Sequence, residues 1–347
     1  MSEQAFVSVF PADIDHNVLA VQVQNILNNT SNGIDEMSVI MGARVATFNP
    51  DATETSDWGA ADSEIVQGIN EVRFRNFLRK AGVDNPKIFN GGQSPRTIIK
   101  PHIHIKEWEA FKDYIGSERS QLLPGSELAN KMMEKPFHFI SGSPFTPLYN
   151  TFLEYPEAST NLKGIYAMHA TWGNVQLMDL NADGAKRGAL QFNVACDPPA
   201  SKFVVDAIQT GAINAPLYLG TAECTRVKEL GFRNYDNLAS FLPKTAKSEA
   251  VLYLYKTWYE KAVRPRQEKS PDELLFIHNV IAGFLFEEEK RNALYEIVPV
   301  KVEVPQDSEN LGKMYLTEVA ESNIYATARL KDGADKLYMQ YLYEMFL

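Results

Sequence analysis

The sequence predicts an α/β protein with an open, mostly parallel sheet flanked by helices. Its 347 residues are 45% hydrophobic and 22% charged, so the chain can bury a large core. Short apolar runs such as residues 5–10 are followed by stretches with apolar residues at helical spacing, such as residues 18–27. This alternation is typical of parallel strands joined by crossover helices. No internal repeat or low-complexity run divides the chain, and we expect one domain over residues 1–347.

The charge and cysteine content exclude several classes of protein. The formal net charge is -10 and no basic block stands out, which argues against a nucleic acid or an anionic membrane surface as partner. No stretch reaches the roughly 20 apolar residues of a membrane span, and the N-terminus lacks a signal-peptide pattern. The two cysteines, Cys196 and Cys224, lack metal-type spacing and are too few for a disulfide framework. We therefore expect buried free thiols in a cytoplasmic protein.

The first strand and helix set the position of the first candidate turn. Residues 5–10 are predicted to form a buried strand, and residues 18–27 the helix after it. The turn between them, residues 11–17, then lies at the carboxyl end of a strand. That edge is where open parallel sheets bind their ligands.

A second strand and a long helix follow, separated by a polar stretch. Residues 37–43 are predicted as the strand and residues 65–81 as the helix. Residues 49–62 between them are rich in Asp, Thr, Ser and Ala, which indicates a solvated loop. We interpret residues 49–62 as a loop insertion.

The middle of the chain contains the most informative stretch. Residues 137–141 are predicted as a central strand that ends in a Gly-Ser-Pro turn before Thr146. Farther on, Asp197 followed by Pro198 is typical of a helix N-cap with proline in the first turn. The amides Gln191 and Asn193 are expected on the loop that leads into this helix, where α/β folds place ligand-binding groups.

The last third of the chain is predicted to begin with two helices. Pro243 separates the first two helices, and Pro265 is expected to end the second. The predicted helices are at 238–242 and 249–262.

The stretch 191–198, Gln-Phe-Asn-Val-Ala-Cys-Asp-Pro, resembles a segment of the inosine/uridine-preferring nucleoside hydrolase family. The family segment reads Glu-Phe-Asn, a few residues, Asp-Pro and then a helix. Residues 164–174 are similar to the family strand that ends in Gly-Asn. The resemblance implies a nucleoside hydrolase-like sheet. It also implies that Asn174, Gln191 and Asn193 bind the sugar of a ribonucleoside-type small molecule. The same resemblance implies a strand within 216–225, closing strands at 300–304, 311–314 and 324–328, and a final helix at 334–346.

The resemblance also implies a calcium site, but this sequence departs from it. In the family, aspartates of the first turn and one late aspartate hold calcium. The late aspartate is replaced by Asn279, and Thr146 matches a threonine that offers its backbone carbonyl. The degenerate calcium-site positions are Ala12, Asn17, Thr146 and Asn279. None of these side chains carries the charged oxygen that hard cations prefer, so we expect no metal cofactor. The four first-turn aspartates of the family fall on Phe10, Ala12, His16 and Asn17.

Two functions remain open from these residues. The first is a nucleoside hydrolase-like protein without calcium, with a non-catalytic role in binding a ribosyl ligand or a protein partner. Ala12 stands at the family's general base and cannot accept a proton, while His16 is expected to contact the ligand. The alternative is an active N-ribosidase that hydrolyses N-glycosyl bonds with bound calcium. It would use Asp13 or Asp15 for the metal or as base, and His16 or His278 for proton transfer, with His278 as the possible acid. The resemblance further implies a homo-oligomer.

Overall fold

A computed structural model describes residues 2–10, 14–29, 33–41, 64–83, 85–92, 120–173 and 191–347 of the chain. The loop insertion predicted at 49–62 lies outside these residues, as do Ala12, Asp13 and Asn174.

The described strands form one nine-stranded sheet with the order β3-β2-β1-β4-β5-β6-β9-β7-β8. β1 lies between β2 and β4, and both pairings are parallel. Strands β3, β5, β6 and β9 extend the parallel part, while β7 pairs antiparallel with β8 and β9. The predicted fold class is thus confirmed. The strands are β1 Glu3–Val9, β2 Ile34–Met41, β3 Lys87–Asn90, β4 Phe137–Ser141, β5 Leu162–Ala170, β6 Leu217–Thr221, β7 Tyr295–Glu303, β8 Tyr315–Glu318 and β9 Ile324–Leu330.

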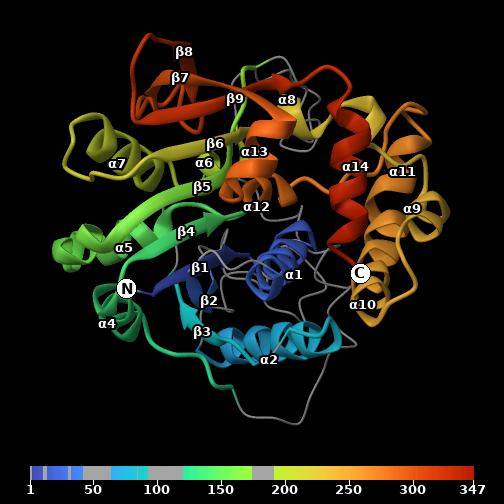
Figure 1. The fold of residues 1–347 in the computed structure, drawn as a ribbon, viewed down its shortest axis with the longest axis horizontal. Helices are drawn as coiled ribbons and strands as arrows, with labels where there is room; N and C mark the ends of the chain where they lie inside the picture. The colour runs from blue at the N-terminus through green and yellow to red at the C-terminus, as the bar shows by residue number, and fades with distance from the viewer. Residues whose placement is uncertain are drawn as a thin grey trace.

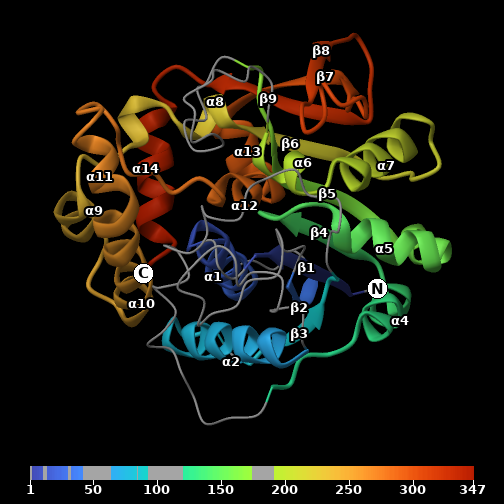
Figure 2. The same ribbon diagram turned by 180° about the vertical axis from the view of Figure 1, so that it is seen from behind.

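Helices cover both faces of this sheet (Figures 1 and 2). Alternate residues of β1 enter different cores, because successive side chains of a strand point to opposite faces. Val7 and Val9 pack with helices α1, α2, α10, α12 and α14, whereas Phe6 packs with α4, α5 and α7. The helices are α1 Ile14–Asn29, α2 Glu64–Lys80, α4 Gly125–Glu134, α5 Thr146–Glu154, α6 Phe192–Cys196, α7 Pro198–Gln209, α8 Ala222–Thr225, α9 Tyr235–Phe241, α10 Ala246–Trp258, α11 Arg264–Gln267, α12 Val280–Phe286, α13 Glu288–Leu294 and α14 Ala334–Glu344.

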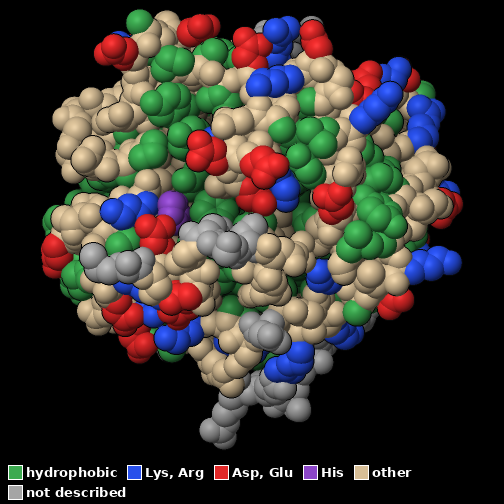
Figure 3. Space-filling view, viewed as in Figure 1, with side chains coloured by type: hydrophobic (Ala, Val, Ile, Leu, Met, Phe, Trp, Pro, Cys, Tyr) green, Lys and Arg blue, Asp and Glu red, His purple; other side chains and the backbone are tan. Residues whose placement is uncertain are grey.

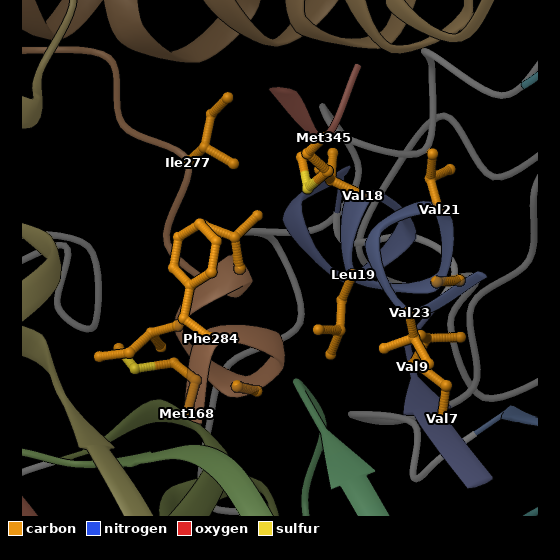
Figure 4. Close-up of a cluster of buried hydrophobic side chains, with 14 of the residues drawn as sticks. Val7, Val9, Val18, Leu19, Val21, Val23, Met168, Ile277, Phe284 and Met345 are labelled. Carbon is orange, nitrogen blue, oxygen red and sulfur yellow. The ribbon is translucent and has the colours of Figure 1, made fainter. Parts of the chain in front are cut away.

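The core between β1 and α1 is built from valine and leucine side chains (Figure 4). Val18 and Leu19 of α1 are fully buried and share a cluster with Phe284 of α12. Ile277, in the segment that leads to α12, belongs to the same cluster. The first helix is therefore packed against the late part of the chain, and both contribute to the site described below.

The C-terminal helix α14 lies beside α9, α10 and α11 at one side of the molecule, and the C-terminus is next to α10 (Figures 1 and 2). Two predictions in this part of the chain are wrong. The helix expected to end at Pro265 continues through a π-helical stretch, Tyr259–Val263, into α11. A local change in the helical hydrogen-bond pattern just before the proline lets the helix accommodate a residue without a backbone N–H. Residues 311–314 form a turn at Gly312, which has a φ of 85°, and the strand begins only at Tyr315.

The surface carries charges of both signs. On the face shown in Figure 3, Lys and Arg side chains are interspersed with Asp and Glu. Within the described ranges, no helix combines the length and apolar character needed to cross a bilayer. Cys196 and Cys224 are buried free thiols, as predicted.

Candidate functional site

Side chains from three segments meet at Gly142, directly after β4. A Cβ atom at Gly142 would lie 3.1 Å from Cδ2 of His16 and 3.2 Å from Oδ1 of Asn279. The Gly142 carbonyl accepts a hydrogen bond of 2.8 Å from Nδ2 of Asn193. The carboxyl end of this central strand thus gathers three predicted site residues from α1, α6 and the start of α12, and a side chain larger than that of glycine would crowd two of them.

His16, in the first turn of α1, is held in one tautomer. Its Nδ1 accepts a hydrogen bond of 2.9 Å from the Phe10 backbone N–H, so the ring proton is on Nε2. The side chain is 2% exposed, and burial lowers its pKa to about 3. His16 is therefore an uncharged imidazole at neutral pH, where the resemblance implies a carboxylate.

Asn193 joins the ends of β4 and β5. Besides the Gly142 carbonyl, Nδ2 donates to the Met168 carbonyl at 2.7 Å. Its Oδ1 is buried and accepts no hydrogen bond from the part of the chain that the structure describes. Asn193 lies in the short helix α6, so the expectation of a loop was wrong there. Gln191 is the N-cap of that helix, and its Oε1 accepts from the Val194 N–H at 3.0 Å.

Asn279 and Asn17 place two neutral amides in the site. Asn279 is the N-cap residue of α12, yet its side chain makes no capping hydrogen bond. Its Oδ1 is buried without a hydrogen-bond donor among the described residues, and the residue is 5% exposed. Asn17, next to His16, is fully buried. Neither side chain brings negative charge to this edge of the sheet.

Thr146 is committed to a structural contact through its hydroxyl. Oγ1 donates to Oδ2 of Asp197 at 2.6 Å, while Oδ1 of Asp197 accepts from the Ala200 N–H at 3.3 Å. Asp197 is thus the N-cap of α7, as predicted. This pair fixes the start of α5 against the start of α7.

His169 is a buried histidine near this pair, and the sequence analysis did not identify it as a site residue. The ring of His169 stacks on Phe145 with 3.9 Å between ring centroids, and its Nε2 is 2.9 Å from Oγ of Ser201. Burial lowers the pKa of His169 to about 3. Its position on strand β5 was predicted, but a lone histidine on a buried strand has no distinctive sequence pattern.

Asp15 and His278, the base and the acid of the alternative function, lie close together. The contact between them is made by the backbone N–H of His278 and not by its ring. One carboxylate oxygen of Asp15 accepts from the Tyr255 hydroxyl, and the other accepts from the His278 N–H at 3.2 Å. The His278 ring places Nδ1 3.3 Å from Oγ1 of Thr225. Burial, reinforced by the charges of Arg226 and Arg266, lowers the pKa of His278 well below its usual value.

The described residues do not provide a group of three or more His, Cys, Asp or Glu side chains that could hold a metal ion. Two surface grooves of about 660 and 450 Å³ lie elsewhere. One is lined by residues such as Lys301 and Asn323 at the start of β9, and the other by residues such as Ile34 and Lys87 at the start of β2 and β3. Both grooves are therefore at the opposite edge of the sheet from Gly142.

Solved structures of nucleoside hydrolases have the same fold over nearly the whole chain. An inosine-uridine preferring nucleoside hydrolase from Bacillus anthracis matches with a TM-score of 0.66 and 13% identity, covering 100% of this chain and 99% of that one. The plant nucleoside hydrolase PpNRh1 also matches with 0.66 and 13%, covering 99% and 98%. No protein-family model matches the chain, and no curated protein matches it. The chain thus has a nucleoside hydrolase-like fold.

The structural neighbours also include an effector protein. The type III effector protein XopQ, in a structure complexed with adenosine diphosphate ribose, matches with a TM-score of 0.61 and 11% identity, covering 100% of this chain and 93% of that one. The fold is therefore shared by hydrolases and by an effector that binds a ribose-containing nucleotide.

Proposed function

We propose that this protein binds a ribosyl ligand at the Gly142 site without calcium and without calcium-dependent hydrolysis. The observation that carries the proposal is the neutral set of side chains at that site. His16 is uncharged at neutral pH because of its burial, and Asn193 and Asn279 each present a buried amide oxygen with no donor among the described residues. Such oxygens are costly to bury alone, and the hydroxyls of a sugar would satisfy them.

The described residues do not fit a calcium ion. Calcium in proteins takes six to eight oxygen ligands, with carboxylates supplying the charge. Asn17 and Asn279 offer amides in place of carboxylates, and both oxygens of the nearby Asp15 already accept hydrogen bonds. This donor set supports ligand binding that does not pass through a metal ion.

The complex of XopQ with adenosine diphosphate ribose supports this class of ligand. It makes adenosine diphosphate ribose and inosine suitable probes. The association into a homo-oligomer and the cytoplasmic location remain predictions, and sedimentation velocity of the purified chain would test the first of them.

The experiment is a calorimetric titration of metal-stripped protein with each probe, with and without calcium, followed by an assay for free base. We expect binding of at least one probe that calcium does not change, and no release of base. Asn279→Ala should weaken that binding about tenfold, since one hydrogen bond to a buried acceptor is lost. Asn292→Ala, at an exposed position, is the matched control.

Two outcomes would overturn the proposal. One is that neither probe binds. The other is release of base at a rate that vanishes in His278→Ala, which would establish the alternative function of an active N-ribosidase.

A further inference from the structure

The peptide bond between Ile277 and His278 is held from both of its polar sides. The Tyr338 hydroxyl donates to the Ile277 carbonyl at 3.4 Å. The His278 N–H donates to Asp15 at 3.2 Å. The carbonyl and the N–H of a trans peptide unit point in opposite directions. Two bonds on opposite sides therefore fix the orientation of this peptide plane.

The groups that hold this peptide bond are themselves fixed in the core. Tyr255 and Tyr338 are almost fully buried, and the Tyr255 hydroxyl donates to the second oxygen of Asp15. Burial and the negative charge of Asp15 raise the pKa of Tyr338, so its hydroxyl keeps the proton that it donates. The Ile277 side chain lies in the hydrophobic cluster of Figure 4. Side chains of α1 and α14, which are far apart in the sequence, thus bind this peptide unit directly, and α10 holds it through Asp15.

We propose that Asp15 is a positioning residue, which acts with Tyr255 and Tyr338 as a clamp on the 277–278 peptide bond. The clamp sets the backbone from which the His278 and Asn279 side chains project. Asp15 is also the helical neighbour of His16, so the same residue fixes both sides of the Gly142 site relative to each other. The consequence for a ligand rests on the proposed function, whereas the consequence for the backbone does not.

This role uses both carboxylate oxygens as the structure places them. A role for Asp15 as a metal ligand or as a general base would have to use the remaining lone pairs of oxygens that already accept hydrogen bonds from Tyr255 and His278. Hydrogen bonds to a carboxylate are among the stronger ones in proteins, and here one donor is a buried phenol. The clamp therefore explains the position of Asp15 without any rearrangement.

The first test is hydrogen exchange of the His278 amide, measured by NMR in the protein alone. Asp15→Asn keeps the size of the side chain, but it gives up the charge and an acceptor oxygen. We expect the His278 amide to exchange about tenfold faster or more, as for the loss of one charge-assisted hydrogen bond. Tyr338→Phe, which removes only a hydroxyl, should accelerate the same amide and provides the test if Asp15→Asn does not fold.

The exchange of the Phe139 amide in the central strand β4 serves as the reference for global stability. Asp35→Asn is the matched control, because Asp35 is an exposed carboxylate that binds Lys135 at the other edge of the sheet. Exchange of the His278 amide that is unchanged in both clamp variants, or changed no more than that of Phe139, would overturn the clamp.

The second test measures the affinity for adenosine diphosphate ribose in the same variants. We expect a loss of about tenfold or more in Asp15→Asn and Tyr338→Phe and none in Asp35→Asn. If the unmodified protein binds neither this probe nor inosine, the proposed function fails while the exchange experiment still decides on the clamp. If the His278 amide exchanges faster but the affinity is unchanged, the positioning role is overturned and the proposed function stands.

Discussion

The polar side chains at the amino ends of strands β1, β2 and β4 differ in charge and in exposure from those at the carboxyl ends. At the amino ends, ionisable groups pair with one another, and the carboxylate of each pair remains partly exposed. Glu3 lies 2.8 Å from Nε2 of His138, and Glu36 lies 2.9 Å from Nζ of Lys131. At the carboxyl ends, the polar side chains around Gly142 include neutral amides, serine hydroxyls and an uncharged imidazole, and these are almost fully buried.

The ion pairs at the amino ends can be explained by the stability of the fold. The buried polar groups at the carboxyl ends cannot be explained in this way. Exposed ion pairs cost little and contribute little. Buried amide oxygens without a donor cost free energy, commonly about 1 to 3 kcal/mol each. Asn193 and Asn279 carry such oxygens at the carboxyl edge. Gln4, at the amino end of β1, also has a buried amide oxygen without a donor among the described residues. What distinguishes the carboxyl edge is that two such oxygens lie there together with the uncharged His16. The proposed ligand would account for that combination.

The largest expected effect comes from Asn193→Asp. The carboxylate would face the carbonyls of Gly142 and Met168, to which the amide now donates. An uncompensated buried charge should lower the free energy of unfolding by about 3 kcal/mol or more. Urea unfolding measures this loss. Asn292→Asp at an exposed position should change stability by less than about 0.5 kcal/mol, and equal losses in the two variants would remove the distinction between a buried and a surface amide.

The buried imidazoles should make the protein sensitive to acid. His16 and His169 have a pKa of about 3 in the folded protein, below the value of about 6.5 in an unfolded chain. The unfolded state therefore binds more protons between these values, and stability falls as the pH drops below 6.5. Each imidazole should account for about 2 kcal/mol between pH 6.5 and pH 5.

Unfolding free energies at several pH values check this dependence. His169→Gln should flatten the dependence, because a glutamine does not titrate. A slope below pH 6.5 that is identical in the variant and the parent protein would contradict the assignment of His169 as a buried neutral group.

Gly142→Ala should have a smaller effect on stability and a specific one on the site. Its Cβ would lie 3.1 to 3.2 Å from His16 and Asn279, which is tight packing. Crowding of this kind costs about 1 kcal/mol or more and should displace both side chains, with weaker binding of adenosine diphosphate ribose. Gly125→Ala is the control, since its Cβ would meet only the Asn90 carbonyl at 3.4 Å. Unaltered binding in Gly142→Ala would argue against a ligand at this position.

The smallest effect is expected at the amino edge. Lys135→Ala removes ion pairs with Asp35 and Glu36, and Lys131 still contacts Glu36 at 2.9 Å. We expect a loss of about 0.5 kcal/mol that decreases at high salt. A loss as large as that of Asn193→Asp would mean that polar groups contribute equally to the free energy of unfolding at the two edges of the sheet.

Most of the fold could be predicted from local sequence patterns. The buried run of β1 and the helical spacing of α1 are properties of adjacent residues, and so is the N-cap at Asp197. One wrong prediction placed Asn193 on a loop, and two others concern Pro265 and residues 311–314. There, local rules for proline and for apolar runs competed with a π-helical stretch and a glycine turn, which depend on the surrounding structure.

The site was predictable only in part, because its contacts are not local. His16, Asn193 and Asn279 were identified from the sequence, but nothing in it indicates that they meet at Gly142. The contacts of Asp15 with Tyr255 and His278 span 240 and 263 residues. A short aspartate-containing turn gives no information on which distant backbone amide it will bind.

The contact between Tyr338 and the Ile277 carbonyl has a consequence for the order of synthesis. β1 and α1 leave the ribosome long before α14, so His16 is available well before Tyr338. Domains of this size commonly form partly structured intermediates during synthesis. A nascent chain that has already paired β1 with β4 would still lack the hydrogen bond from Tyr338 to the 277–278 peptide bond. The ordered form of the site should thus be a late event in the life of each new chain, later than the sheet that supports it.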